Sequence, residues 1–324
     1  MKKLIIPILM IAMFSGCQNA RETRTIRLAH TLDLSHPVHK AIVRFSELLE
    51  QKSGGKLKAE IYPNGQLGSE RECLELMQIG SLDVTKVSAS TMENFSPDYR
   101  VLGLPYIFRD SAHINKVLGG EIGRRLLTQG ERYWLRGLCF YDAGSRSFYS
   151  KEKPIETPSD LKGLKVRVMN SKTAFDMIQA MGGSPTPVSW GELYTALQQG
   201  VVDAAENNAP SFYTSKHYEI CKYYSIDKHT SVPDVLLVST HLWNDLSDEE
   251  KEWVQAAADE SVPYQKEVWA QAVEESLEAV KEAGVEIVYP ATAPFQGAVE
   301  NIYGQYKTSE PDFYNLIKEV QAVK

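Results

Sequence analysis

Cysteine is scarce in this sequence, with 4 residues among 324 and no CxxC pair. Apart from Cys17 near the N-terminus, the chain has Cys73, Cys139 and Cys221, an odd number that argues against a disulfide framework. We expect these three to be small buried apolar residues. His36 lies three residues before His39, but no cluster of acids or cysteines accompanies the pair, so we predict no metal site.

Positive charge is also in short supply, because 35 Lys and Arg stand against 42 Asp and Glu and the formal net charge is −7. An acidic chain is poorly suited to bind the phosphates of a nucleic acid. The sequence lacks an HExxH zinc motif, a GxSxG nucleophile elbow and a P-loop, and the NGQLGSE segment is not a phosphate-binding glycine motif. We therefore predict no nucleic-acid partner, no cofactor and no catalytic residues.

No apolar run is long enough to span a bilayer as a helix. The run from Leu4 to Phe14 follows two lysines and precedes small residues, which is typical of a secretory signal. Its FSGC ending resembles a lipoprotein cleavage box, so we predict a signal over 1–16, an acylated Cys17 and a tether over 17–24. The alternative is a plain signal cut elsewhere. We expect a periplasmic protein that is lipid-anchored to a membrane.

From Thr25 onward, strand-like runs alternate with amphipathic helical stretches, which predicts an α/β fold with largely parallel strands. The segment SERECLELMQIGSLD from Ser69 matches SWGELYTALQQGVVD from Ser189 at corresponding offsets. Each begins with a Ser-x-x-Glu capping box and reaches a glycine that ends a helix. We predict two similar α/β domains, one over 25–143 plus about 233–272 and the other over 144–232 plus about 273–324. Chance similarity is the alternative, because capping boxes are common.

A long helix is predicted from the capping box at Ser247 and Glu250 to Gly284. About 37 residues at 1.5 Å each give roughly 55 Å, which exceeds one compact domain of this size. We expect Pro263 to kink this helix and the helix to bridge both domains. The irregular apolar spacing makes a coiled-coil dimer the weaker interpretation.

Ligands of open parallel sheets bind beyond the carboxyl ends of the strands, where helix N-termini converge. The repeat and the strand ends place nine candidate ligand-binding residues there: Arg167, Arg146, Asn207, Glu70, Asn208, Lys86, Trp190, His30 and Ser88. Two arginines suit a carboxylate and the amides suit hydroxyls, so this set predicts an anionic, hydroxyl-rich ligand. The alternatives are an exposed edge-strand position for Arg167 and a packed core position for Trp190 or His30.

The sequence resembles the solute-binding receptors of tripartite ATP-independent periplasmic (TRAP) transporters over about residues 24–320. The resemblance is carried by YPNGQLGSERE, LGLPYIF, DLKGLKVRV, GGSPTPVSWGELYTALQQGVVDAAENN and the long C-terminal helix. It implies two α/β domains in a clam-shell arrangement that close on a ligand, and integral-membrane transporter subunits that use a sodium gradient. It also implies that Arg167 binds the ligand carboxylate, with Arg146, Asn207 and Glu70 completing the site.

The AENNAPSFYTS and TKVSA segments look like those of uronate-binding members, which implies D-glucuronate or D-galacturonate as the captured ligand. Three alternatives stay open. One is a receptor for another acid, such as sialate or a dicarboxylate. Another is a secreted carbohydrate enzyme that pairs the carboxylates of Glu70 and Glu206. The last is a sensor lobe that presents its ligand to a membrane kinase.

Overall fold

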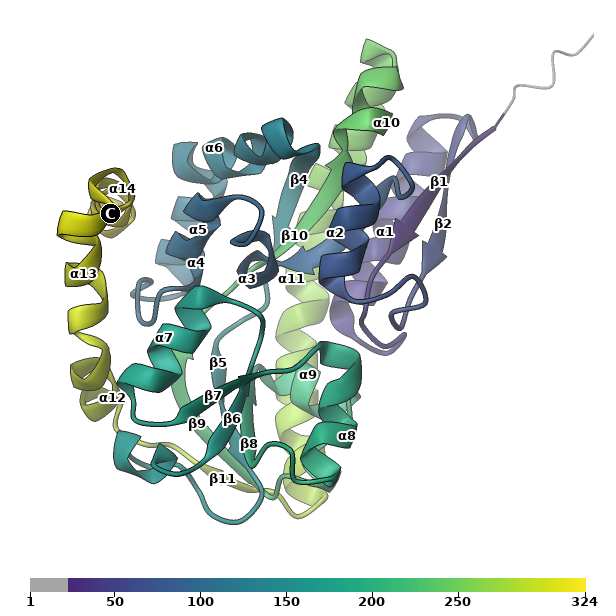
Figure 1. Cartoon of the computed structure of the whole chain (residues 1–324). Helices are drawn as coiled ribbons and strands as arrows, with labels where there is room; N and C mark the ends of the chain where they lie inside the picture. Colours follow the sequence, from purple (N-terminus) through teal and green to yellow (C-terminus); the bar gives the residue numbers. More distant parts are fainter. Residues whose placement is uncertain (1–22) are drawn as a thin grey trace, which may run out of the picture.

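A computed structural model describes residues 23–324, which form two lobes, each built around one β-sheet (Figure 1). The sheet of lobe I, the upper lobe in the figure, has the strand order β2-β1-β3-β10-β4. Its strands are β1 (Arg24–Ala29), β2 (Leu57–Tyr62), β3 (Val84–Ser88), β4 (Leu135–Tyr141) and β10 (Asp234–Ser239). The helices around it are α1 (Pro37–Lys52), α2 (Glu70–Gln78), α3 (Ala89–Met92), α4 (Arg100–Gly103), α5 (Ser111–Gly119), α6 (Glu121–Gln129) and α10 (Thr240–Asp245).

The sheet of lobe II has the strand order β11-β9-β5-β8-β6-β7. Its strands are β5 (Arg146–Ser150), β6 (Lys165–Val168), β7 (Ser184–Pro187), β8 (Ala204–Asn207), β9 (Tyr223–Thr230) and β11 (Glu286–Val288). The helices of this lobe are α7 (Lys172–Ala180), α8 (Leu193–Gln198) and α9 (Ala209–Thr214), with short 3-10 turns between them. The remaining helices, α11 (Asp248–Glu282), α12 (Thr292–Val299), α13 (Asn301–Ser309) and α14 (Pro311–Ala322), follow β10 and α10.

The sheets are mixed, whereas the sequence pattern predicted largely parallel strands. β10 runs antiparallel to β3 and β4 in lobe I, and β5 runs antiparallel to β8 and β9 in lobe II. Both strands come directly after a crossing between the lobes. The chain leaves one sheet at the end that faces the other lobe, so it enters the second sheet from the side that faces the first. It therefore runs antiparallel to the strands whose carboxyl ends point toward the space between the lobes.

The predicted long helix is confirmed as α11, which contains 35 residues. Its capping box is complete, because the Ser247 side chain accepts from the Glu250 amide and the Glu250 carboxylate accepts from the Ser247 amide. The helix packs on α1 and β4 in lobe I and on α9 in lobe II, passing from one lobe to the other (Figure 1). Pro263 lies inside it. The kink at this proline stays a prediction.

The two copies of the internal repeat begin their helices differently. Ser69 and Glu72 form the complete capping box that the sequence predicted for α2. In the second copy, residues 190–192 form a 3-10 turn before α8. The Glu192 amide donates to the Ser189 carbonyl at 3.2 Å, so it is not available to the Ser189 hydroxyl. That hydroxyl instead lies 2.5 Å from the Glu192 carboxylate.

The C-terminal helices contact both lobes. α12 and α13 pack on α7 of lobe II, while α14 packs on α4 of lobe I. Arg109 of lobe I donates to the carbonyls of Gln321 and Val323, and Arg125 pairs with Glu319. The domain boundaries suggested by the sequence therefore stay a prediction, and the last helix shares contacts with the lobe to which it was not assigned.

Three further expectations concern cysteines, metals and membranes. Cys73, Cys139 and Cys221 are free and buried, as expected. Within residues 23–324, no group of three or more His, Cys, Asp or Glu is arranged to hold a metal ion. In the same span, no helix has the length and apolar character needed to cross a bilayer. The predicted signal over 1–16 and the acylated Cys17 lie outside the described residues.

Candidate functional site

A cavity of about 580 Å³ lies between the two lobes. Its walls come from the loop after β1, the start of α2 and the end of β3 in lobe I, and from β5, β6, β8 and the loops after them in lobe II. Among the nine predicted ligand-binding residues, the lining includes Arg167, Arg146, Asn207, Asn208, Glu70, Lys86, Ser88 and Trp190. The strand ends that the repeat identified thus meet at one cavity, and the ligand-binding role of these residues stays a prediction.

His30 is the predicted residue that does not line the cavity. Its side chain is buried, with Nε2 at 2.9 Å from Nδ1 of His39 and Nδ1 accepting from the Leu32 amide at 3.1 Å. Burial and the nearby Lys86 lower the pKa of His30 to about 3, so the ring is neutral. The structure thus places His30 in the packed position that was its alternative, and His36 lines the cavity instead.

Arg167 is a buried cation that has no acidic partner in hydrogen-bond contact within residues 23–324. It lies on β6, an interior strand between β8 and β7, and is 2 % exposed, which excludes the edge-strand interpretation. Nε donates to the Val188 carbonyl at 2.9 Å, while the buried Nη1 has no hydrogen-bond partner among the described residues. Burial lowers the pKa of this guanidinium, and nearby Tyr149 and Glu206 only partly offset that effect. An arginine keeps its proton even so, and a buried unpaired charge is costly.

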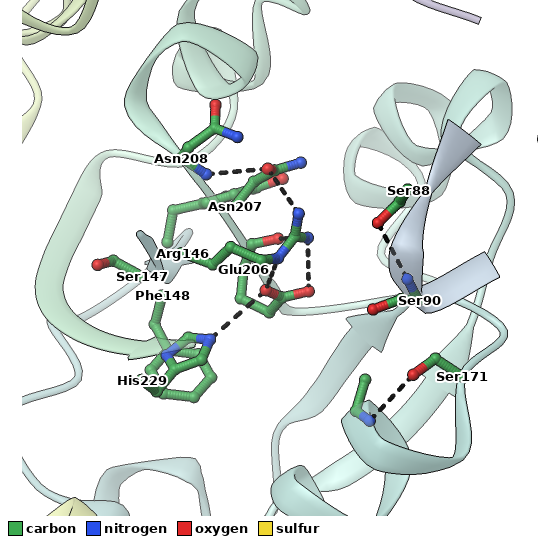
Figure 2. Close-up of polar contacts among 12 residues, drawn as sticks. Ser88, Ser90, Arg146, Ser147, Phe148, Ser171, Glu206, Asn207, Asn208 and His229 are labelled. Carbon is green, nitrogen blue, oxygen red and sulfur yellow. Dashed lines mark hydrogen bonds and ion pairs between the residues drawn. The ribbon is translucent and has the colours of Figure 1, made fainter. Parts of the chain in front are cut away.

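Arg146 stands in contrast, because an acid already neutralises it. Its guanidinium contacts both carboxylate oxygens of Glu206, at 2.5 and 2.8 Å, and the Asn207 side-chain oxygen at 2.9 Å (Figure 2). Burial alone would raise the pKa of Glu206, but Arg146 and His229 outweigh it and lower the pKa to about 2. Glu206 does not line the cavity. This placement argues against the paired-carboxylate enzyme that was one alternative.

Behind Glu206 lies a buried histidine that the sequence-based prediction missed. His229 on β9 is 0 % exposed and places Nε2 at 3.4 Å from Glu206 (Figure 2). Its Nδ1 lies 2.9 Å from Asp227. Burial alone would lower the pKa of His229, but the two carboxylates raise it to about 9. The signal in the sequence was the i, i+2 spacing of Asp227 and His229, which puts both on one face of a strand.

Asn207 and Asn208 present amide donors to the cavity. Asn207 Oδ1 accepts from Arg146 and from the Asn208 amide, and Asn208 Oδ1 caps α9 by accepting from the Ser211 amide at 2.9 Å. Both oxygens are therefore engaged. The two Nδ2 groups have no protein acceptor among the described residues and remain available to a ligand. Trp190 completes this wall, with its ring 5.7 Å from the guanidinium carbon of Arg167.

The wall of lobe I holds a buried lysine between two acids. Lys86 Nζ lies 3.0 Å from Glu70 and 3.2 Å from Asp234. Burial would lower the pKa of Lys86, but Asp234 and Glu70 outweigh it and raise the pKa. The sequence-based prediction included Lys86 and Glu70 but missed Asp234, which pairs with them only through the register of β10 against β3.

The lobes also contact each other beside the cavity. His36 Nδ1 accepts from the Val38 amide, which leaves Nε2 as the donor toward the Ser211 hydroxyl of lobe II at 3.1 Å. His36 is buried, and burial and Lys86 lower its pKa well below the usual range, so this neutral tautomer persists. A second contact joins the Asn94 side chain to the Asn170 carbonyl at 2.6 Å.

The sequence of this chain is similar to those of known bacterial proteins. A family model described as Bacterial extracellular solute-binding protein, family 7 (DctP) matches residues 28–309. The protein YiiZ of Salmonella typhimurium is 39 % identical to this chain, over 92 % of this chain and 91 % of YiiZ.

Two solved structures superpose on nearly the whole chain. A TRAP periplasmic solute-binding protein from a Bradyrhizobium species, in complex with D-galacturonate, is 40 % identical, with a TM-score of 0.89 over 92 % of this chain and 99 % of that protein. Another from Roseobacter denitrificans, with bound β-D-glucuronate, is 37 % identical, with a TM-score of 0.90 over 93 % of this chain and 100 % of that protein. The chain therefore belongs to family 7 of the bacterial extracellular solute-binding proteins, the DctP family of TRAP receptors.

Proposed function

We propose that this receptor captures a hexuronate, D-glucuronate or D-galacturonate, by closure of its two lobes and delivers it to a TRAP-type membrane transporter. The ligands bound to the two solved relatives support this choice. The chemistry of the cavity supports it independently. Lobe II offers a cation and two amide donors, whereas lobe I offers acids, a lysine and hydroxyl groups.

The observation that carries the proposal is the buried guanidinium of Arg167. It has no acidic partner in hydrogen-bond contact within the described chain and it faces a cavity large enough for a small ligand. A planar guanidinium binds a carboxylate through two parallel hydrogen bonds, and such pairing offsets the cost of burying the charge. Arg146 is less suited to this role, because Glu206 already takes most of its donors.

Closure needs no bond making or breaking. A ligand held by Arg167 of lobe II and by the polar wall of lobe I adds contacts to both lobes only when they are close. The ligand therefore favours the closed state by its differential affinity for that state. The strand crossings and α11 keep the lobes joined while they move.

We further propose that the receptor acts in the periplasm and is held at a membrane through an acylated Cys17. The leader pattern at residues 1–17 supports the anchor, and the family supports the periplasmic location and the transporter partner. Labelling of the chain with a radioactive fatty acid in a bacterial host would test the anchor. Loss of label in Cys17→Ser is expected, and equal labelling of both chains would contradict it.

A thermal-shift panel tests the ligand. It contains glucuronate, galacturonate, their neutral parent sugars, sialate and small dicarboxylates. A ligand at 100 times its dissociation constant adds about 2.7 kcal/mol to the free energy of unfolding, which raises the melting temperature by several degrees. We expect only the uronates to do so. If only sialate or a dicarboxylate raises the melting temperature, that acid and not a uronate is the ligand. If the neutral sugars raise it equally, the proposed role of Arg167 is contradicted.

A further inference from the structure

The buried cluster of Lys86, Glu70 and Asp234 has two open hydrogen-bonding positions. Lys86 is 2 % exposed, and its Nζ contacts one oxygen of Glu70 and one of Asp234. An ammonium has three donors, so one remains without an acceptor among the described residues. All three side chains line the cavity.

The two acids differ in how fully their oxygens are used. Glu70 Oε1 accepts from Lys86, while Oε2 accepts from the Ser88 amide at 3.1 Å and the Thr91 hydroxyl at 2.7 Å. Asp234 is 7 % exposed and accepts from Lys86 through Oδ1, whereas its Oδ2 has no donor in the described part of the chain. The free acceptor of this wall is therefore on Asp234.

The charge of the cluster decides which part of a ligand it binds. Two carboxylates around one ammonium leave one negative charge in excess, which repels a ligand carboxylate. Burial raises the pKa of Asp234 to about 6, and the negative charge of Glu70 adds to this rise while Lys86 opposes it. A hydroxyl group meets both open positions, because it donates to Asp234 and accepts from Lys86 at the same time.

We propose that Asp234 and Lys86 together bind one ring hydroxyl of the uronate, and that Glu70 is a positioning residue that holds Lys86 without touching the ligand. This assignment rests on the proposed function and deepens it. It fixes the direction of the ligand, with the carboxylate at Arg167 in lobe II and the selected hydroxyl at Asp234 in lobe I. It also makes Asp234 a specificity-determining residue.

Calorimetry with the full chain tests the assignment. A hydrogen bond to a charged group supports an expected loss of about 10- to 100-fold in glucuronate affinity for Asp234→Asn. Asp245→Asn makes the same charge change at the far end of the β10–α10 unit and should bind as the wild type does. Equal melting temperatures of the ligand-free variants would show that both are folded.

A series of glucuronates that each lack one hydroxyl isolates the contact through a double-mutant cycle. One analogue should bind the wild type about 10-fold or more weakly than glucuronate does, and this penalty should be clearly smaller in Asp234→Asn, where Lys86 alone still contacts the hydroxyl. Glu70→Gln should reduce the preference for the intact sugar over that analogue less than Asp234→Asn does, because Glu70 holds Lys86 but does not contact the hydroxyl.

Two outcomes would overturn the assignment in different ways. Suppose the wild type binds glucuronate, but each analogue loses the same factor in affinity relative to glucuronate in Asp234→Asn as in the wild type. Asp234 then binds no hydroxyl of the ligand, while the proposed function stands. If the wild type binds no uronate, the proposed function fails and this assignment fails with it.

Discussion

At the scale of single residues, the structure distinguishes two arginines that are equivalent by residue type alone. Arg146 is bound to Glu206 before any ligand arrives, whereas Arg167 has one carbonyl contact and an Nη1 without a partner in the part of the chain that the structure describes. A guanidinium that is already paired gains little from a second carboxylate. We therefore propose that Arg167 recognises the charge of the ligand.

Replacing Arg167 should test this directly. In Arg167→Ala we expect uronate affinity to fall by about 2–5 kcal/mol, because the ligand carboxylate would be buried without a partner. Arg167→Lys should lose less, since it keeps the charge but cannot bind bidentately. Calorimetry measures both. Arg125→Ala, which removes an exposed arginine of lobe I, is the control, and near-normal affinity of Arg167→Ala would show that the carboxylate binds elsewhere.

The buried cluster of His229, Asp227 and Glu206 predicts a pH dependence of stability. The pKa of His229 is about 9 in the folded chain, against an ordinary value of 6.5. The folded state holds this proton more tightly, so its stabilising effect is complete below pH 6.5 and is lost as the pH rises through about 9. The loss amounts to about 3 kcal/mol.

Denaturant unfolding between pH 6 and pH 10 measures this loss. The wild type should lose stability across that range, and His229→Gln should lose much less while being less stable at pH 7. His241→Gln, which changes a histidine on lobe I, should follow the wild type. The same slope in His229→Gln and in the wild type would mean that another group is responsible.

At the scale of elements, the sequence was most informative where a signal is local. The capping boxes at Ser69 and Ser247 predicted the starts of α2 and α11, because a Ser-x-x-Glu pattern acts within one helical turn. The same pattern at Ser189 did not form a complete box, since a 3-10 turn intervened. Propensity could not indicate this turn, as its geometry depends on the neighbouring strand and loop.

Residue pairs that meet only through strand register could not be predicted from the sequence. Asp234 and Lys86 lie 148 residues apart, and the pairing of β10 with β3 brings them together. The antiparallel directions of β5 and β10 were missed for the same reason. By contrast, eight of the nine predicted residues line one cavity, because the repeat located the strand ends in both lobes at once.

We expect the N-terminal cap of α11 to stabilise the folded chain measurably. Ser247→Ala removes the acceptor for the Glu250 amide and should lower the free energy of unfolding by about 1 kcal/mol. Ser247→Asp keeps an acceptor and should retain most of the stability. Thermal unfolding of the ligand-free chain measures both variants, and an unchanged midpoint for Ser247→Ala would show that tertiary packing alone holds the start of the helix.

At the scale of the whole molecule, His36 and Ser211 connect the lobes beside the cavity. Since this contact joins opposite walls, it exists only when the lobes are close, and it adds to the stability of the closed state. A ligand that needs the closed state binds more weakly when that state is less populated.

Ser211→Ala should therefore weaken uronate binding by about 5- to 10-fold, which corresponds to one hydrogen bond, with most of the change in the dissociation rate. Ser215→Ala is the matched control, because Ser215 lies on the same stretch of chain and its hydroxyl donates to the Ser211 carbonyl of its own lobe. Stopped-flow fluorescence can follow both. An unchanged dissociation rate in Ser211→Ala would exclude the contact as a determinant of closure.

The place of β10 inside the first sheet also governs the order in which the chain folds. β3 and β4 lie on either side of β10, so lobe I lacks a central strand until residue 239 is available. Until then both neighbours expose unpaired edges, which favour aggregation, and pairings so distant in sequence form slowly. A nascent or truncated chain that stops before Asp234 therefore holds an unfinished sheet, and we expect it to be a substrate for chaperones and proteases in a way that the complete receptor is not.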